Sequence, residues 1–164
     1  RLEGPDEGVL DDLLHLLLGG ADRDLLERPF RRYYAEASRQ RGVTGDNLMR
    51  LLELRLDNAV FRASFAESRQ QARQFVAHSH VTVNGRKVNR PSYLLKKGDV
   101  LAIKEKSKKN EVVQRSAEKG RARGVPAWLD VDLTDMQARV LELPGLADVQ
   151  LEVNVQQIVE LYSK

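Results

Sequence analysis

The sequence predicts an α+β fold: a mostly helical domain with a small inserted α+β module (helix, helix, strand, hairpin), then a short C-terminal strand pair and a helix. Three observations predict it. Apolar residues recur at helical spacing after residue 46, an Asn-Gly pair separates two strand-like segments within 81–88, and apolar alternation returns over 137–153. With 164 residues and 41% hydrophobic content, the chain can build one ordinary domain or two small ones.

The N-terminal segment, residues 1–29, is acidic and rich in Leu. We expect one short helix at about 9–18, because Gly and Pro interrupt the rest of the segment. Pro29 suits the first turn of a helix, so the next helix is expected over residues 30–40. Gly42 then ends that helix.

A longer helical pattern begins at Asn47. Its apolar residues recur every three or four positions and are Leu48, Leu51, Leu52, Leu56 and Val60. Farther on, Ser68 and Gln71 fit a capping box, in which the hydroxyl accepts from a first-turn amide and the glutamine reaches back. The helix they start is expected to bury Ala72, Phe75 and Val76 and to expose Arg69, Arg73 and Gln74.

Strands follow this helix. Residues 81–83 read as a short strand, and Asn84-Gly85 is the strongest two-residue hairpin signal, because both positions tolerate positive φ. We expect the pair to form the turn and also to let backbone amides approach a partner closely. A second turn at residues 97–99 leads into an apolar strand over 100–103.

The remaining chain is first basic and then mixed. Residues 104–123 are rich in Lys and Arg and predict a basic helix. Strands are expected over 137–143 and 149–153, and Asn154 can cap a final helix. The predicted organisation is an acidic segment at 1–29, a helical domain built from 30–46 and 104–164, and a module at 47–103.

Charge is distributed unevenly along the chain. Residues 1–29 carry 3 Lys/Arg and 8 Asp/Glu, residues 30–124 carry 22 and 9, and residues 125–164 carry 2 and 7. The balances are therefore −5, +13 and −5, which sum to the net +3. A basic middle that coincides with a structured module favours a polyanionic partner, so we expect nucleic-acid binding.

Composition argues against several other classes of protein. The chain has no cysteine, which excludes disulfides and thiolate zinc sites and fits a reducing compartment. No apolar run approaches the roughly 18 residues of a membrane span. His78 and His80 without a nearby carboxylate pair make a poor metal site, so neither a metal nor a cofactor is predicted. The absence of an initiator Met and of a signal-peptide start suggests a piece of a longer protein.

Several short pieces resemble the family of ribosomal protein four of the bacterial small subunit, over about residues 26–164. They are FRRYYAEA (30–37), GVTGDNLMRLL (42–52), RLDN (55–58), SRQQARQFV (68–76), VTVNGRKV (81–88), PSY (91–93), GDV (98–100), GVPAWL (124–129) and IVELYSK (158–164). One piece alone is weakly specific, since the module at 55–103 occurs in many RNA-binding proteins, but all of them in this order are highly specific. Residues 1–25 depart from the family, whose members usually carry a longer basic arm, sometimes with zinc-binding cysteines.

The resemblance implies a structural constituent of the small ribosomal subunit rather than an enzyme. Such a protein is a primary binder of small-subunit ribosomal RNA, at a junction of helices near the 5′ end, and nucleates assembly. It contributes to the mRNA entry region and to translational accuracy, touches neighbouring small-subunit ribosomal proteins, and in some members represses its own mRNA. The expected location is the ribosome of the cytoplasm or of an organelle.

Binding of folded RNA requires cations on rigid elements, together with polar groups that fix the register. Arg69 and Arg73 are four residues apart and so line one helix face, while Arg86 and Lys87 follow the hairpin tip. Ser68 is expected mainly to cap its helix. The predicted RNA-binding residues are Arg31, Arg32, Arg55, Arg62, Ser68, Arg69, Arg73, Gln74, His78, His80, Asn84, Gly85, Arg86, Lys87, Lys96 and Lys97.

Two other functions remain open from the sequence. The triplet Arg55-Leu56-Asp57 is similar to one that carries the catalytic Asp of pseudouridine synthases, some of which also contain this RNA-binding module. It lies before the module's capped helix and not in a large catalytic domain, so Asp57 is more simply an ion-pair partner or a helix-face residue. A free-standing RNA-binding regulator is the other alternative, although such a protein has no need of the ending at 124–164.

Overall fold

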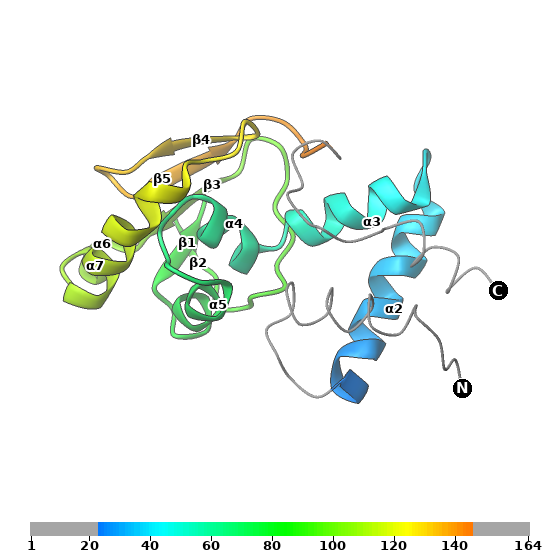
Figure 1. The fold of residues 1–164 in the computed structure, drawn as a ribbon, viewed down its shortest axis with the longest axis horizontal. Helices are drawn as coiled ribbons and strands as arrows, with labels where there is room; N and C mark the ends of the chain where they lie inside the picture. The colour runs from blue at the N-terminus through cyan, green and yellow to red at the C-terminus, as the bar shows by residue number, and fades with distance from the viewer. Residues whose placement is uncertain (1–22, 146–164) are drawn as a thin grey trace. The chain divides into compact units, whose positions relative to one another are not determined.

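The computed structural model describes residues 23–145 of the chain. These residues divide into two compact units, the first with the residues up to Leu52 and with Gly145, and the second running from Glu53 to Pro144. Figure 1 shows the elements of both units along the chain. No helix in the described part of the chain is long and apolar enough to cross a membrane.

The first unit contains helix α2 (Arg23–Arg39) and helix α3 (Thr44–Glu53), which ends at the unit boundary. Asn47 closes the turn between them, because its Nδ2 donates to the carbonyl oxygens of Ala37 and Arg41, each at 3.2 Å. The predicted helix end at Gly42 is confirmed, with a φ of 106° there. The buried apolar residues of this unit are Phe30, Ala37, Leu48, Met49, Leu51 and Leu52.

Helix α2 begins earlier than predicted and contains Pro29 in its interior. The sequence places this proline in the first turn, where its missing N–H costs nothing. Leu, Arg and Glu, which are strong helix formers, precede it. The helix therefore continues across Pro29 at the cost of one backbone hydrogen bond.

The continuous helix predicted from Asn47 to Val60 is broken in the structure. Helix α3 ends at Glu53, and α4 (Leu56–Arg62) begins only after an extended Arg55, with φ −61° and ψ 141°. Backbone hydrogen bonds from the segment at 93–95 replace helical ones: Leu56 N donates to Tyr93 O at 2.8 Å, and Leu95 N donates to Leu54 O at 2.9 Å. The 3.6-residue periodicity runs through this break, so spacing alone does not reveal it.

Helix α5 (Arg69–Ala77) starts as predicted. The Ser68 hydroxyl accepts from Gln71 N at 3.1 Å, which confirms the cap. The Gln71 side chain reaches back to the amide of Glu67 at 2.8 Å, one residue earlier than in a capping box. The predicted burial of Ala72, Phe75 and Val76 is confirmed. Gln74 is exposed as expected, but Arg69 and Arg73 are half-buried.

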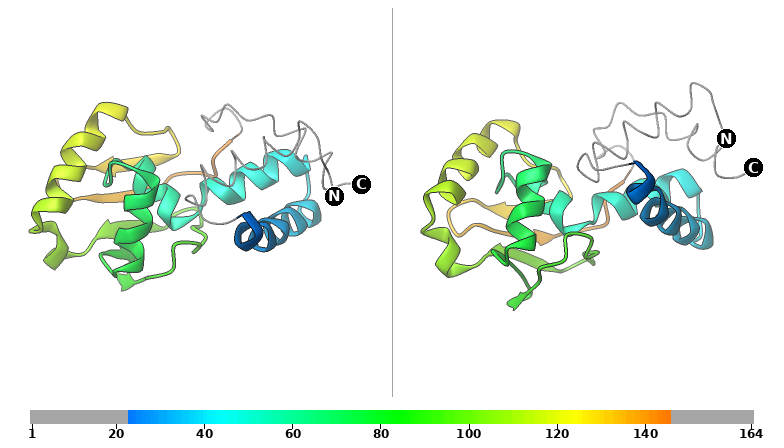
Figure 2. Two further views of the ribbon diagram at one scale, coloured as in Figure 1. Left: turned by 60° about the horizontal axis from the view of Figure 1, so that its bottom comes forward. Right: turned by 90° about the horizontal axis from the view of Figure 1, so that it is seen from below.

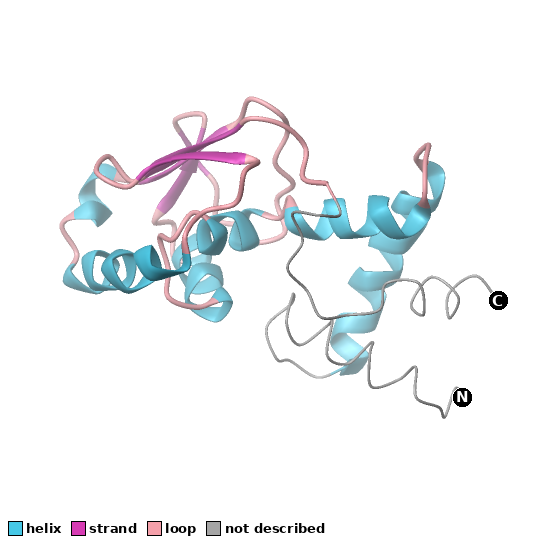
Figure 3. Ribbon diagram, turned by 45° about the horizontal axis from the view of Figure 1, so that its top comes forward, coloured by secondary structure: helices cyan, strands magenta, loops and turns pink. Residues whose placement is uncertain are grey.

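In the described residues, five antiparallel strands form one sheet in the order β2-β1-β3-β5-β4. Figure 3 shows the strands in magenta. They are β1 (Val81–Val83), β2 (Arg86–Lys87), β3 (Val100–Ile103), β4 (Leu129–Asp132) and β5 (Gln137–Val140). The strand predicted from Gln137 is confirmed, although it ends at Val140. Its hairpin partner is β4, which the sequence pattern does not predict, and the strand predicted at 149–153 lies outside the described residues.

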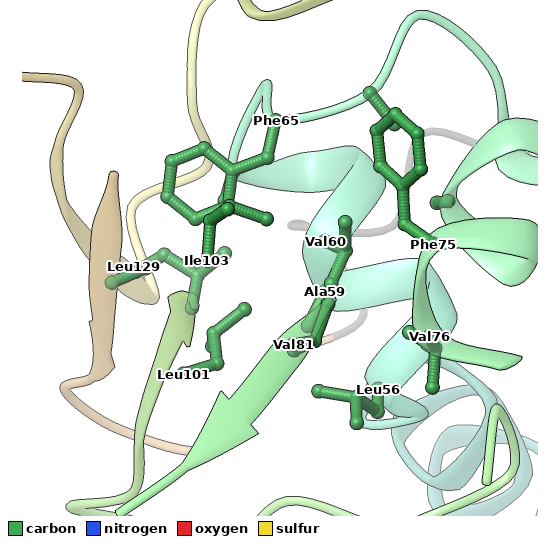
Figure 4. Packing of buried hydrophobic residues seen from close by; sticks show 14 of the residues in the cluster. Leu56, Ala59, Val60, Phe65, Phe75, Val76, Val81, Leu101, Ile103 and Leu129 are labelled. Atoms are coloured by element: carbon green, nitrogen blue, oxygen red, sulfur yellow. The ribbon is translucent and has the colours of Figure 1, made fainter. Parts of the chain in front are cut away.

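The core of the second unit lies between the sheet and the helices α4 and α5 (Figure 4). Trp128 and Phe65 are its largest fully buried side chains. Helices and strands both contribute to it, through Leu56, Ala59, Val60, Phe75 and Val76 on one side and Val81, Leu101, Ile103 and Leu129 on the other. Burying side chains of this kind stabilises each by about 1.5–3 kcal/mol, so this core holds the surface residues of the unit in place.

The basic stretch predicted as one helix forms three pieces, which are α6 (Glu105–Lys108), α7 (Glu111–Gly120) and the 3-10 helix η1 (Arg121–Arg123). Figure 2 shows this yellow-green part of the chain from two directions. Asn110 starts α7 by accepting from Val112 N at 2.9 Å, so its capping preference divides the stretch. At the other end of α7, a Cβ on Gly120 would lie 2.5 Å from Ser64 O, and only glycine allows this approach.

The second unit is larger than the module predicted from the sequence. The sequence groups residues 104–164 with residues 30–46, whereas residues up to Pro144 fold in the same unit as the module. The physical reason is strand pairing, because β5 lies directly beside β3, with Leu101 opposite Ala138. Pairing between strands so distant in the sequence leaves no local signal.

Candidate nucleic-acid interface

Four exposed cations lie on two adjacent turns of the second unit. Arg86 and Lys87 form strand β2 after the hairpin tip, and Lys96 and Lys97 precede β3. We call these four residues the hairpin–turn cluster. All four were predicted to bind RNA, and the structure leaves their side chains accessible to a large polyanion.

Side-chain hydrogen bonds join the two turns. Asn84 Nδ2 donates to Asp99 Oδ1 at 3.0 Å, while Asn84 Oδ1 accepts from Val100 N at 2.9 Å. The other carboxylate oxygen of Asp99 accepts from Lys96 N at 2.8 Å. Asn84 and Gly85 have φ values of 51° and 79°, as the predicted tight hairpin requires. The Asn84 side chain is therefore committed to holding the turns together.

We predict that Asp99→Ala weakens RNA binding even though it removes a negative charge. The substitution takes away the acceptor for the Asn84 side-chain amide and for the Lys96 amide, so the positions of the two turns are less well fixed. Stability should fall by about 1–2 kcal/mol, the cost of leaving such groups unpaired. Filter binding and urea unfolding measure the two effects. Glu118→Ala removes an exposed acid from α7 and should leave RNA affinity equal or higher; an Asp99→Ala variant that behaves like it would contradict the prediction.

A second group of arginines surrounds Phe61 at the end of α4. The Arg69 guanidinium lies 4.6 Å from the Phe61 ring centroid, and Arg69 Nε donates to Asn58 Oδ1 at 3.3 Å. Burial, reinforced by the positive charge of Arg62, lowers the pKa of Arg69 to about 10, although Glu53 acts in the opposite direction. Arg69 stays charged at neutral pH, in surroundings that penalise its charge.

Arg62 is mostly taken up by a carboxylate. Its Nη2 lies 2.9 Å from Glu53 Oε1, and only 13% of its side chain is exposed. The same glutamate accepts a hydrogen bond from Asn58 Nδ2 at 2.7 Å. Because Glu53 neutralises most of its charge, Arg62 is less available to an RNA phosphate than the sequence predicts.

Arg55 is buried, so the prediction that it contacts RNA requires a correction. Its side chain is 4% exposed and holds the Asp57 carboxylate with two bonds, from Nε at 3.1 Å and from Nη2 at 2.9 Å. Asp57 also accepts from Asn58 N at 2.7 Å. The interpretation of Asp57 as an ion-pair partner is confirmed, and Arg55 serves the interior and not the surface.

The two predicted histidines differ in their surroundings. His78 is exposed, whereas the half-buried His80 shares a hydrogen bond of 2.7 Å, through Nδ1, with the Ser107 hydroxyl. Burial, then the neighbouring His78 and Lys104, lower the pKa of His80, which favours its neutral form. Among the side chains that the structure describes, residues 29–145, no three of His, Cys, Asp or Glu gather as a metal site would require.

The remaining predicted residues fall into two groups. Arg31 and Arg32 are exposed on α2 in the first unit. Ser68 and Gln74 are exposed on the second unit, where Ser68 is used as a helix cap. Arg123, which sequence reasoning did not single out, lies 3.9 Å from the Phe61 ring centroid. It is far from α4 in the sequence, so no motif indicated this contact.

Comparison with known proteins identifies the family. Residues 54–101 match the S4 domain, and residues 21–53 match the ribosomal protein S4/S9 N-terminal domain. The small ribosomal subunit proteins uS4 of Chloroherpeton thalassium and of Heliobacterium modesticaldum are each 51% identical to the chain over 140 residues. These alignments cover 85% of the chain and 69% and 67% of the relatives. The chain therefore belongs to the family of small ribosomal subunit protein uS4.

Proposed function

We propose that this chain is a structural constituent of the small ribosomal subunit and binds small-subunit ribosomal RNA. The observation that carries the proposal is the hairpin–turn cluster on a rigid S4 domain, in a chain about half identical to small-subunit proteins along most of its length. Cations fixed in position by a packed core suit a folded RNA, whose phosphates also have fixed positions.

The residues that we propose to contact RNA are the predicted ones whose side chains solvent can reach. Six of the predicted cations are exposed: on the first unit Arg31 and Arg32, and on the second unit Arg86, Lys87, Lys96 and Lys97. Half-buried Arg69 and Arg73 and exposed His78 and Gln74 can add contacts beside them. Arg55 is left out because it is buried.

The finer assignments rest on the family resemblance. We propose that the chain binds ribosomal RNA as a primary binder and nucleates subunit assembly. In the finished subunit it would contribute to the mRNA entry region and to translational accuracy, beside neighbouring ribosomal proteins. Repression of its own mRNA, and a place on cytoplasmic or organellar ribosomes, belong to the same proposal.

The surroundings of Asp57 support a structural and not a catalytic role. A catalytic aspartate must reach its substrate, whereas this residue is 4% exposed and bound by Arg55 and by the amide of Asn58. The pseudouridine-synthase alternative is correspondingly weak. No observation favours the free-standing regulator, because strands β4 and β5 complete the sheet of the module.

Crosslinking tests the proposed function directly. Irradiating the chain in purified small subunits, digesting the RNA and sequencing the attached fragments should return a small set of small-subunit ribosomal RNA positions. The crosslinked peptides should contain residues of the hairpin–turn cluster. Crosslinks spread over unrelated cellular RNAs would favour the regulator, and an absence of the chain from small subunits would overturn the proposal.

A further inference from the structure

The Arg69 side chain is half-buried at the start of a helix, where its surroundings disfavour the positive charge. It is the first residue of α5, whose first turn contains no acidic residue. A cation there faces the positive end of the helix dipole, which is unfavourable. Burial and then the charge of Arg62 lower the pKa of Arg69, and the carboxylates of Glu53 and Asp57 offset this only in part.

Arg69 also has unused hydrogen-bond donors. Its Nε donates to Asn58, and its guanidinium rests on Phe61. Among the described residues, the two terminal amino groups of Arg69 have no hydrogen-bond partner, and no carboxylate pairs with it. A planar guanidinium with its outer edge free is shaped to hold two oxygens of a phosphate or a carboxylate.

Arg123, from a distant part of the chain, contacts the end of α4 and the loop that precedes Arg69. Its Nη1 donates to Glu67 O at 3.1 Å, and its Nη2 donates to the carbonyl oxygens of Phe61 and Ala66 at 3.0 and 2.6 Å. These contacts tie η1 to the loop that joins α4 to α5. Because Arg69 begins α5 directly after this loop, Arg123 fixes both the ring beneath Arg69 and the start of its helix.

We propose that Arg69 binds one phosphate group of the ribosomal RNA beside the N-terminus of α5, and that Arg123 is the positioning residue of this site. The proposal rests on the proposed RNA-binding function and adds a defined contact to it. An RNA phosphate is favoured over a carboxylate ligand because the exposed cations of the unit suit a polyanion. The first-turn amides of a helix, which lack partners within the helix, can donate to the same phosphate.

A bound phosphate would also compensate the excess positive charge around Phe61. Asp57 is neutralised by Arg55, and Glu53 by Arg62. Arg69 and Arg123 then remain as two positive charges around one aromatic ring. Arg123 lies beyond the residues that match the S4 domain, so the site needs η1 as well as the module.

Matched substitutions in the full chain test the site, with binding to a small-subunit ribosomal RNA transcript measured over a range of salt. Arg69→Gln should lower RNA affinity about tenfold, as expected for a charge-assisted bidentate contact. It should also reduce the slope of log affinity against log salt by about 0.7–0.9, the value for one lost phosphate contact. Arg123→Gln should give a similar loss, while Arg121→Gln, which removes an exposed charge from the same 3-10 helix, should change affinity by less than about threefold.

The double variant distinguishes one site from two. If Arg123 acts through Arg69, then Arg69→Gln combined with Arg123→Gln should bind RNA about as well as Arg69→Gln alone, because coupled residues are not additive. Independent, additive losses would overturn the shared site. So would an Arg123→Gln variant whose RNA affinity matches that of Arg121→Gln.

A second readout covers the case in which Arg123→Gln does not fold. The Nε–H resonance of Arg69 should shift when inorganic phosphate is titrated into the wild-type chain and should shift less in Arg123→Lys, which keeps the charge but loses the fork. Equal shifts and equal RNA affinities in the two proteins would overturn the positioning role.

The same RNA-binding measurements distinguish failure of this site from failure of the proposed function. If the wild-type chain does not prefer small-subunit RNA over an unrelated transcript, the proposed function is wrong. If the wild-type chain does prefer it but Arg69→Gln binds equally well, only this site is wrong.

Discussion

RNA affinity should fall by roughly 10³–10⁵ between about 50 and 200 mM salt, the range expected for six to ten phosphate contacts. Six of the predicted cations are exposed and two more are half-buried, which gives the chain enough charge for that number of contacts; these residues are Arg31, Arg32, Arg86, Lys87, Lys96, Lys97, Arg69 and Arg73. Each phosphate that binds releases counterions, and added salt opposes that release. Filter binding of a small-subunit ribosomal RNA transcript over a salt series measures the slope.

A variant of the hairpin–turn cluster provides the matched test of this slope. Lys87→Gln combined with Lys97→Gln removes two exposed charges from the cluster, and the slope should fall by roughly 1.4–1.8. Stability should change by no more than about 0.5 kcal/mol for each exposed site. An affinity that is nearly flat across the salt range would remove RNA-backbone contact as the basis of binding.

Asp57→Ala should destabilise the second unit by about 3–5 kcal/mol, the usual cost of removing one partner from a buried ion pair. The Arg55 guanidinium would remain in the interior, where only 4% of its side chain is exposed, and would lose the carboxylate that it now holds with two bonds. The Asn58 amide would lose its acceptor in the same step. Urea unfolding followed by circular dichroism gives the change in the free energy of unfolding.

Two controls separate this effect from a general sensitivity to mutation. Glu36→Ala breaks the exposed pair with Arg39, whose atoms lie 3.4 Å apart, and should cost no more than about 1 kcal/mol. Replacing both buried partners, with Arg55→Met and Asp57→Leu, should restore much of the stability because no unpaired charge remains. A single Asp57→Ala variant as stable as the wild type would show that the pair contributes nothing to the fold.

Local features of the fold could be predicted from the sequence. The Ser68 cap, the buried face of α5 and the Asn84-Gly85 hairpin each depend on residues within a few positions of one another. Capping preferences and positive φ act at that range. Such signals are complete in the sequence because both partners of every interaction lie in the same short window.

The candidate interface was predicted less completely. Arg86 and Lys87 are exposed as expected, because they follow a turn that must lie at the surface. Arg55 has the same charge but lies at the break between α3 and α4, where its side chain is buried with Asp57. Residue type indicates what a side chain can bind, but burial decides whether a partner can reach it.

The sequence by itself determined the family, the local turns and caps and the basic character of the middle of the chain. Only the tertiary structure decided that the 93–95 segment interrupts the long helical pattern, that β5 pairs with β3 and that Arg123 meets Phe61 beside Arg69. Each of these joins residues far apart in the chain. Long-range contacts of this kind form only because folding buries a common core, and their energy depends on a geometry that no short window of sequence contains.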